Sequence, residues 1–417
     1  MEFPQMIRID QDFDAPVVED VHEAVLSEVA RLKLGRKISS GQTAAVACGS
    51  RGVTNYASIV QATIEALKKL GLEPFIVPAM GSHGSSTAEG QVDILRHRGI
   101  SEVSMGAPIR SSLDVIAIGE TRDRVPVFMD RHAAQADHVV LVNRIKAHTD
   151  FQGEVGSGLL KMLAVGLGKP RGAATYHQAI FSHGYSETIL SFARTHLQFG
   201  KLLFGVGSIE NAYGQTARIV ALPPESLIEE EAALLEVAKQ LAPRLPFESA
   251  DVLVIDEMGK EISGTGFDTN VVGRIQQPQF SGEPISPQVK RIVVCDLTDD
   301  SYGNALGVGH ADFITQCLAD KIDRGALYSN AIAALQPEPA KIPLTLANDR
   351  EAIEIAMRSV GRIPIESLRL IRIRNTMALG EVDVSEAYRD EVGSRTDLTI
   401  RSVAAMQFDT QGNLPAF

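Results

Sequence analysis

The apolar and polar positions of the chain form short buried runs that alternate with amphipathic stretches. Apolar runs at 43–52, 73–81 and 136–143 end in small or polar residues, as strands of a buried parallel sheet do. Residues 55–71 lie between the first two runs and place apolar side chains at helical spacing. These strand–loop–helix units predict an α/β fold with mostly parallel sheets. Further helices are predicted over 17–33, 185–198 and 225–241, with a hairpin over 114–129.

The turn signals between these runs predict where the helices begin. Thr54 precedes the helix at 55–71 and can cap it. Ser86 and Glu89 have the S-x-x-E spacing of a capping box after the second strand.

The same pattern restarts after a stretch with two prolines at 243–250. Apolar runs at 250–259 and 290–298 predict buried strands of a second sheet. We therefore predict two α/β domains, one over residues 1–245 and one over 246–417.

Composition narrows the class of protein. The 417 residues are 44% apolar and 22% charged, and the net charge of −12 comes without a basic stripe, which argues against nucleic acid as a partner. No apolar run approaches the roughly 20 residues that span a bilayer, so no membrane partner is expected. The N-terminus is acidic and lacks the apolar core of a signal peptide. Three cysteines without a pairing pattern favour the reducing cytoplasm.

Basic residues nevertheless gather at predicted strand ends and in the glycine-rich loops beside them. Since parallel sheets bind ligands at the carboxyl ends of their strands, this placement suits an anionic ligand. Scattered surface charge is the alternative explanation. The residues concerned are Arg51, Arg144, Lys146, Lys161 and Lys260.

Three histidines and one lysine are candidates for chemistry. His83 lies between glycines at a helix start, where it can serve the helix or act as a general acid/base. His148 follows basic residues that would keep its imidazole neutral. Lys161 lies in an apolar run after a glycine-rich turn, where it can snorkel or react, and His177 follows 16 positions later. The chain has no Walker A, no strand–GxGxxG–helix and no GxSxG sequence, which disfavours ATPases, ordinary nicotinamide dehydrogenases and serine hydrolases.

These residues in this order resemble the lactate racemase family, whose members carry a nickel-pincer nucleotide. Arg51 follows the first strand, and the glycine-flanked His83 follows the second. His148 then precedes an S-G-x-x-K loop that ends in Lys161, and His177 closes the pattern. The match covers most of the first domain and, in the second, only the segment DEMGK around Lys260.

The resemblance implies two α/β domains with an active-site cleft between them. The cofactor would be a pyridinium-3,5-bisthiocarboxylic acid mononucleotide with nickel, provided by cofactor-biosynthesis proteins. The reaction would invert the carbinol carbon of a small anionic 2-hydroxy acid. By the resemblance, Lys161 would be the covalent attachment point with Ser157 and Gly158 beside it, His177 the nickel ligand, His83 and His148 the two acid/base residues, and Arg51, Lys260 and Glu257 the substrate-binding residues.

The chain departs from the family pattern in three ways. Cys48 stands where the family has an aspartate, the segment from His148 to Lys161 is longer than expected, and there is no tryptophan to close a pocket around lactate. We therefore expect a larger or more polar substrate, bound by polar residues that include Ser263 and Thr265. Two other functions remain open, namely a cofactor-dependent lyase or hydrolase on the same scaffold and a non-catalytic binding protein for an anionic metabolite or nucleotide.

Overall fold

The structure, a computed structural model, describes residues 2–274 and 286–417 and divides into two compact units. The N-terminal unit comprises Ala15–His148 and Gln152–Ala242. The C-terminal unit comprises Pro243–Phe417, Thr149–Phe151 and the chain up to Asp14. The chain therefore leaves the N-terminal unit within the stretch 243–250 that the sequence marked as a junction. The first strand, however, belongs to the C-terminal unit and not to a domain spanning 1–245.

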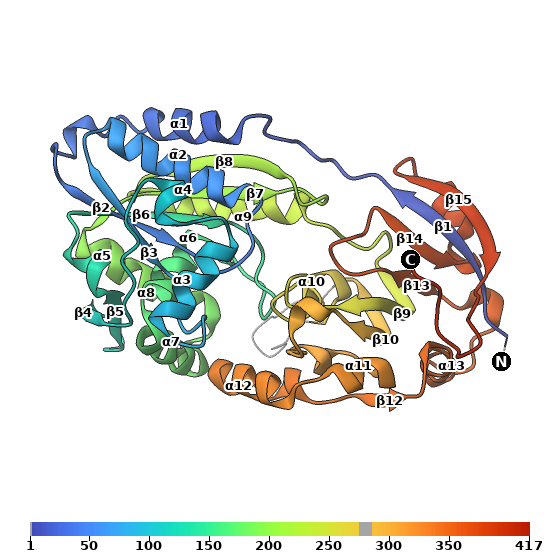
Figure 1. Ribbon diagram of the computed structural model, residues 1–417. Coiled ribbons are helices and arrows are strands. Elements are labelled where there is room, and N and C mark those ends of the chain that lie inside the picture. Colours follow the sequence, from blue (N-terminus) through green and yellow to red (C-terminus); the bar gives the residue numbers. More distant parts are fainter. Residues whose placement is uncertain (1, 275–285) are drawn as a thin grey trace. The chain divides into compact units, whose positions relative to one another are not determined.

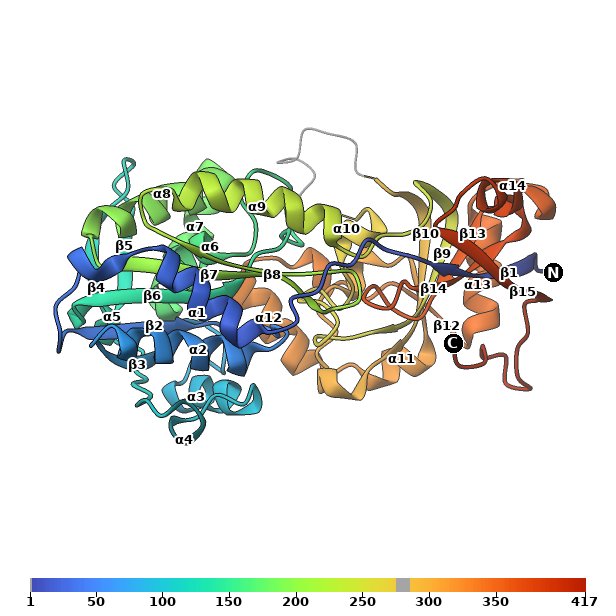
Figure 2. The same ribbon diagram turned by 90° about the horizontal axis from the view of Figure 1, so that it is seen from above.

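The N-terminal unit is built on a five-stranded sheet with the order β3-β2-β6-β7-β8. All neighbours are parallel except β7 and β8. Figure 2 shows α1 and α2 on one side of this sheet and α6, α8 and α9 on the other. The strands are β2 (Thr43–Cys48), β3 (Glu73–Pro78), β6 (His138–Arg144), β7 (Leu202–Glu210) and β8 (Thr216–Leu222). The predicted hairpin is present as antiparallel β4 (Val115–Glu120) and β5 (Pro126–Asp130).

The helices of this unit follow the apolar periodicity, but two predicted caps were wrong. Asn55 rather than Thr54 precedes α2, because the Thr54 hydroxyl donates to the Gly214 carbonyl instead. Thr87, not Ser86, caps α3 by accepting a hydrogen bond from the Gly90 amide. The helices are α1 (Val21–Arg31), α2 (Tyr56–Lys69), α3 (Ala88–His97), α4 (Glu102–Met105), α5 (Arg131–Gln135), α6 (Leu159–Lys161), α7 (Lys169–His183), α8 (Tyr185–Phe199) and α9 (Leu227–Leu241), with a π-helical turn at Met162–Gly166.

The C-terminal unit is built on an eight-stranded sheet with the order β12-β11-β10-β9-β13-β14-β1-β15. Neighbours are parallel from β12 to β13 and antiparallel from β13 to β15. Figure 1 shows the N-terminal strand β1 lying beside β14 and β15 near the end of the chain. The strands are β1 (Gln5–Gln11), β9 (Ser249–Met258), β10 (Gln288–Leu297), β11 (Phe313–Thr315), β12 (Leu344–Leu346), β13 (Leu370–Ile373), β14 (Glu381–Ser385) and β15 (Leu398–Ala405).

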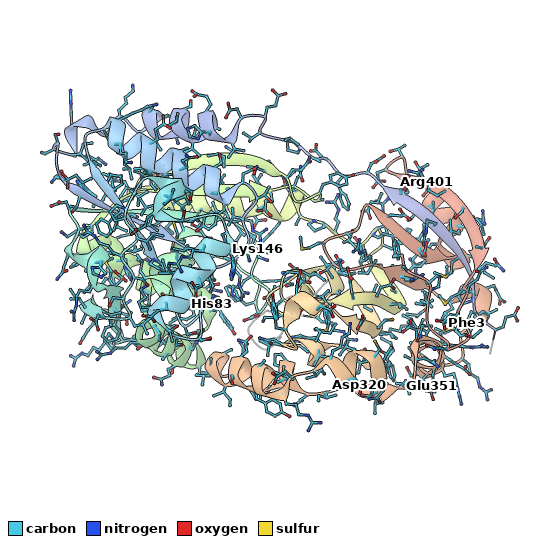
Figure 3. All side chains as sticks on the ribbon, in the orientation of Figure 1. Phe3, His83, Lys146, Asp320, Glu351 and Arg401 are labelled. Carbon is cyan, nitrogen blue, oxygen red and sulfur yellow. The ribbon has the colours of Figure 1, made fainter. Side chains whose placement is uncertain are left out.

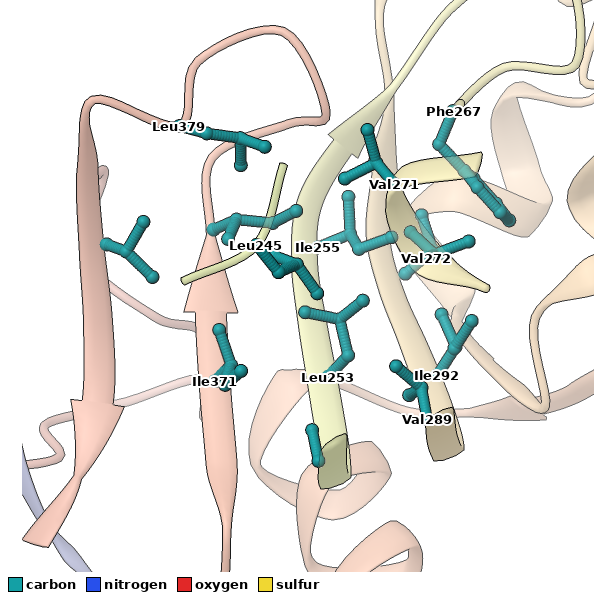
Figure 4. Close-up of a cluster of buried hydrophobic side chains, with 14 of the residues drawn as sticks. Leu245, Leu253, Ile255, Phe267, Val271, Val272, Val289, Ile292, Ile371 and Leu379 are labelled. Atoms are coloured by element: carbon teal, nitrogen blue, oxygen red, sulfur yellow. The ribbon is translucent and has the colours of Figure 1, made fainter. Parts of the chain in front are cut away.

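One face of this sheet carries a cluster of aliphatic side chains. Leu253 and Ile255 on β9, Ile292 on β10 and Ile371 on β13 are fully buried there, and the short helix α10 adds Val272 (Figure 4). The helices of the unit are α10 (Thr269–Val272), α11 (Gln316–Lys321), α12 (Arg324–Ala334), α13 (Asp349–Ser359) and α14 (Arg389–Gly393). The prediction of an α/β fold with mostly parallel sheets is thus confirmed, while the predicted cleft between domains stays a prediction. In the part of the chain that the structure describes, no helix is both long and apolar enough to cross a bilayer.

Candidate active site

The strand order of the N-terminal unit creates a place for a ligand at the carboxyl ends of β2 and β6. From β2 the chain crosses to β3 on one side, and from β6 it proceeds to β7 on the other. Ligands of open α/β sheets bind where the strand order reverses in this way. Cys48 pairs with Pro78 on β3 and with Val142 on β6, so β2 and β3 end level with each other while β6 continues to Arg144. The loops that follow these ends carry Arg51, His83 and His148, as the sequence predicted.

His83 is held at its ring by a residue that the sequence did not single out. The Ser50 hydroxyl, in the loop after β2, is hydrogen-bonded to Nδ1 of His83, in the loop after β3. Both side chains are half-buried. His83 and Lys146 are labelled in Figure 3 and lie at the carboxyl-end edge of the sheet. Since Ser50 occupies Nδ1, proton exchange with a substrate would use Nε2 of His83.

His148 and Lys161 are in direct contact. Nζ of Lys161 hydrogen-bonds Nε2 of His148, whose side chain is buried. A lysine ammonium can only donate, so Nε2 accepts and the imidazole proton lies on Nδ1. Burial lowers the pKa of His148 well below its usual value, and the positive charges of Lys161, Lys146 and Arg51 lower it further. His148 is therefore a neutral imidazole among cations at neutral pH.

The glycine-rich segment before Lys161 is pressed against its neighbours. Ser157 and Lys146 exchange two backbone hydrogen bonds of 2.8 Å, which fold the segment back onto the end of β6. A Cβ on Gly156 would lie 2.4 Å from the Lys146 carbonyl oxygen, so only glycine fits there. The Asn143 side-chain amide donates to the Gly158 carbonyl at 3.0 Å. Ser157 and Gly158 are thus fixed beside the helix that presents Lys161.

A buried carboxylate accepts hydrogen bonds from the first backbone amides of α6, the helix that presents Lys161. Glu231 on α9 accepts the backbone N–H groups of Leu159 and Leu160, at 2.8 Å and 3.1 Å from Oε2. Burial raises the pKa of Glu231 to about 7, although these two amides lower it. The sequence analysis did not select Glu231 as a site residue. Its position does fit the apolar stripe of Leu227, Leu234 and Leu235, and that spacing was the available signal.

His177 and Cys48 have different surroundings. His177 lies on α7, is half-buried, and contributes to the positive electrostatic environment of His148. Its ring is edge-on to that of Tyr176, with centroids 5.5 Å apart. Cys48 is fully buried in the core that also contains Tyr56, and burial raises the pKa of its thiol to about 12. Cys48 is therefore a neutral core residue and offers no charge in place of an aspartate.

Arg144, one of the predicted cations, is paired with Glu210 and is largely buried with it. The pair lies between β6 and β7, which are neighbours in the sheet. Arg144 is therefore neutralised locally, and the cations around His148 are Arg51, Lys146 and Lys161.

The C-terminal unit holds the remaining predicted residues at the carboxyl end of β9. Nζ of Lys260 donates to the Gly264 carbonyl at 2.5 Å and to Oδ1 of Asn330 at 3.0 Å. Glu257 accepts from Arg374 at 2.9 Å and from the Asn375 amide at 2.8 Å. These two residues are thus embedded in local hydrogen bonds of their own unit. Ser263 and Thr265 are buried and lie in hydrogen-bond contact with each other.

Comparison with known proteins bears on the family and the fold of the chain. Residues 10–188 match the family model described as the lactate racemase N-terminal domain. Among solved structures, the chain is similar to the lactate racemase apoprotein from Thermoanaerobacterium thermosaccharolyticum, with a TM-score of 0.53 and 12% identity. The similarity covers 90% of this chain and 99% of that one, and at this identity it shows the fold. A search of curated protein sequences found no match.

Proposed function

We propose that this chain, a homologue of the lactate racemase family, is a racemase or epimerase that inverts the carbinol carbon of a 2-hydroxy acid. The observation that carries the proposal is the contact of neutral His148 with Lys161 at the sheet edge where Arg51 and the Ser50-held His83 also lie. Inversion requires proton exchange on both faces of the substrate, and this edge provides one histidine after β3 and one after β6, the two strands that flank β2.

The residues of the N-terminal unit fit a nickel-pincer nucleotide. Lys161 would hold it covalently beside Ser157 and Gly158, and His177 would bind nickel, for which a neutral imidazole is a suitable ligand. When bound, the cofactor supplies a hydride acceptor. In the described residues, no three His, Cys, Asp or Glu side chains cluster as a metal site, so the other nickel ligands would come from the organic part of the cofactor.

The two histidines would move the protons. His148 is neutral because of burial and nearby charge, so it can accept the hydroxyl proton at Nε2 once that atom no longer accepts a hydrogen bond from Lys161. A covalent bond from Lys161 to the cofactor would remove the positive charge of its ammonium. Among nearby charges, that ammonium lowers the pKa of His148 most, so its loss would raise this pKa toward neutral pH. His83 would serve the opposite face, with Ser50 fixing its tautomer.

The cations would bind the substrate carboxylate. Arg51 is exposed beside this pair and can hold a carboxylate through two parallel hydrogen bonds. Lys260 and Glu257 would contribute from the C-terminal unit once a substrate replaces part of their present hydrogen bonding. A cytoplasmic location, with cofactor-biosynthesis proteins as partners, belongs to the same proposal.

The test is intact mass and nickel content of protein produced together with the cofactor-biosynthesis proteins. Wild type should exceed the chain mass and contain nickel. Lys161→Ala should lose the mass adduct, and His177→Ala should keep the adduct but lose nickel. Lys69→Ala changes an exposed lysine paired with Glu65, so this variant should carry the same mass adduct and nickel content as wild type. An adduct in Lys161→Ala, or stoichiometric nickel in His177→Ala, would overturn the corresponding role.

A further inference from the structure

Lys169 is a completely buried lysine at the start of α7. Its side chain has no solvent exposure, and its φ of 54° places the backbone in the left-handed region. Nζ lies 2.5 Å from the Pro78 carbonyl oxygen, 2.9 Å from Oε1 of Gln91 and 3.3 Å from Oδ2 of Asp130. The ammonium thus donates to one oxygen on β3 and one on α3, and its charge is paired with a carboxylate at the end of β5.

Gln91 continues this contact toward the candidate active site. Its side chain is fully buried, and Nε2 donates to the Gly81 carbonyl at 2.9 Å and to the His83 carbonyl at 3.3 Å. Gln91 therefore accepts from Lys169 with its oxygen and holds the loop of His83 with its nitrogen. The path from Lys169 to the backbone of His83 thus consists of a buried hydrogen bond to Gln91 and a part-buried one from Gln91 to the His83 carbonyl.

The loop needs such support because its backbone is unusual. Ser85 and Ser86 both have a φ of 54°, and Gly81 and Gly84 also have positive φ. Left-handed residues other than glycine are costly and persist when their surroundings fix them. Gly84 lies so close to α3 that a Cβ there would be 2.7 Å from the Gln91 backbone nitrogen.

A lysine is an expensive way to fill a buried position. Burial lowers the pKa of Lys169, and Asp130 opposes this shift by pairing with its charge. An apolar side chain could occupy similar volume without desolvating two charges. An apolar side chain could not donate to the Pro78 and Gln91 oxygens while pairing with the charge of Asp130. The buried Lys169–Asp130 pair is therefore explained by the elements that Lys169 holds together.

We propose that Lys169 and Gln91 are positioning residues that fix the backbone of His83, while Ser50 fixes its ring. This inference rests on the proposed function, which makes His83 an acid/base residue. The two supports act on different atoms. Loss of the Gln91 contacts would free the loop without removing the Ser50 hydrogen bond, and loss of Ser50 would free the ring without releasing the loop.

The decisive variant is Gln91→Glu. A glutamate keeps an oxygen for Lys169 but has no N–H for the carbonyls of Gly81 and His83. We expect amide hydrogen exchange in residues 82–90 of the full-length protein to accelerate by at least about tenfold, the size expected when buried hydrogen bonds are lost. The thermal midpoint should fall only as far as the loss of these two hydrogen bonds requires. Gln91→Met, which has no acceptor for Lys169 either, should accelerate exchange at least as much.

Gln61→Glu is the matched control. Gln61 donates to the Ser104 carbonyl at 3.5 Å on the exposed surface, so the same chemical change there should leave residues 82–90 unaffected. Ser50→Ala should change the ¹⁵N shifts of the His83 ring and leave exchange in the loop as in wild type. Unchanged exchange at 82–90 in both Gln91 variants would overturn the positioning role.

Activity separates this inference from the proposed function. In cofactor-loaded enzyme, Gln91→Glu should lower kcat about tenfold or more, with KM little changed, because the loop no longer holds a proton-transfer group in place. If the loop exchanges faster but wild type inverts no hydroxy acid, the proposed function fails and the positioning of the loop stands. If wild type is active and Gln91→Glu retains its full kcat, the positioning role fails alone.

Discussion

The two units carry charged residues at the carboxyl ends of their parallel strands, but they arrange them differently. In the N-terminal unit, Lys161, Lys146 and Arg51 surround His148 and lower its pKa. In the C-terminal unit, Glu257 is bonded to Arg374 and Asn375, and Lys260 is bonded to Gly264 and Asn330. One edge gathers cations around a titratable group, and the other distributes its charges into local contacts.

Farther along the C-terminal sheet, the same pairing of opposite charges continues. Arg372 makes two hydrogen bonds to Asp256, and Arg8 makes two to Asp383, across strands β9, β13, β14 and β1. Opposite charges that pair within a sheet are usual in structural contacts, whereas like charges around a buried titratable group are the pattern expected of a functional site. This difference is why the chemistry proposed for the chain is placed on residues of the N-terminal unit.

The largest effect should come from the two histidines. Replacing His83 or His148 by alanine should each lower kcat/KM by about 10²–10⁴, the usual contribution of a general acid/base. Racemisation of a single-enantiomer hydroxy acid, followed by chiral chromatography, measures it. His22→Ala removes a surface ring bonded to Glu65 and should leave the rate unchanged. Full activity in both active-site variants would reject the two-base mechanism, and ligand binding without turnover in wild type would favour a binding protein.

A smaller effect should appear when substrates are compared. A polar 2-hydroxy acid, such as a sugar acid, should be turned over about 10–100-fold better than lactate, because each buried polar group left unpaired costs about 1–3 kcal/mol. Lys260→Met should reduce this preference, mainly through KM. The measurement is kcat/KM over a panel of enantiopure acids, with the exposed Lys341→Met as control. Lactate as the best substrate would contradict the expectation.

The smallest effect concerns the stability of the N-terminal unit alone. The pKa of Glu231 is about 7 instead of 4.5, so the folded protein binds a proton that the unfolded chain releases. Stability from this group is complete below about pH 4.5 and is lost as pH rises through about 7. Glu231→Gln removes this loss. The free energy of unfolding of the variant, relative to that of wild type, should therefore rise by about 1–3 kcal/mol from pH 4.5 to pH 8.

Denaturant unfolding at both pH values measures that difference. Glu229 on the same helix is exposed, so Glu229→Gln should show no such dependence. If the free energies of unfolding of Glu231→Gln and wild type differ by the same amount at pH 4.5 and pH 8, the pKa of Glu231 is not raised by burial.

Much of the fold could be predicted because buried parallel strands have continuous apolar runs. β2, β6 and β9 were recognisable from such runs, and their strand ends placed Arg51 and His148 at one edge. β1 was missed because QMIRIDQ alternates apolar and polar residues, and nothing local indicates that it pairs with strands from the other end of the chain. Contacts over such sequence distances are decided by tertiary packing.

Candidate site residues could be proposed from the sequence where the residue type itself carries the chemistry. His83, His148 and Lys161 were chosen on that basis together with the family resemblance. Ser50, Gln91 and Glu231 were not, since their roles depend on which partner each side chain meets. Glu231 in particular follows two exposed glutamates near the start of α9, where the helix dipole alone would account for an acidic side chain. Only the fold shows that it turns inward to the amides of Leu159 and Leu160.

The position of β1 in the sheet also sets an order of events during synthesis. Its seven residues are synthesised before every other strand of the two sheets, yet both of its partner strands, β14 and β15, lie after residue 380. All strands of the N-terminal unit are synthesised much earlier than β14 and β15. This unit can therefore fold while β1 is still unpaired. A fragment beginning at Pro243 would lack the strand between β14 and β15 and would expose a new edge on β14. Isolating this unit as a soluble piece therefore calls for a permuted chain in which residues 2–14 are joined after Phe417.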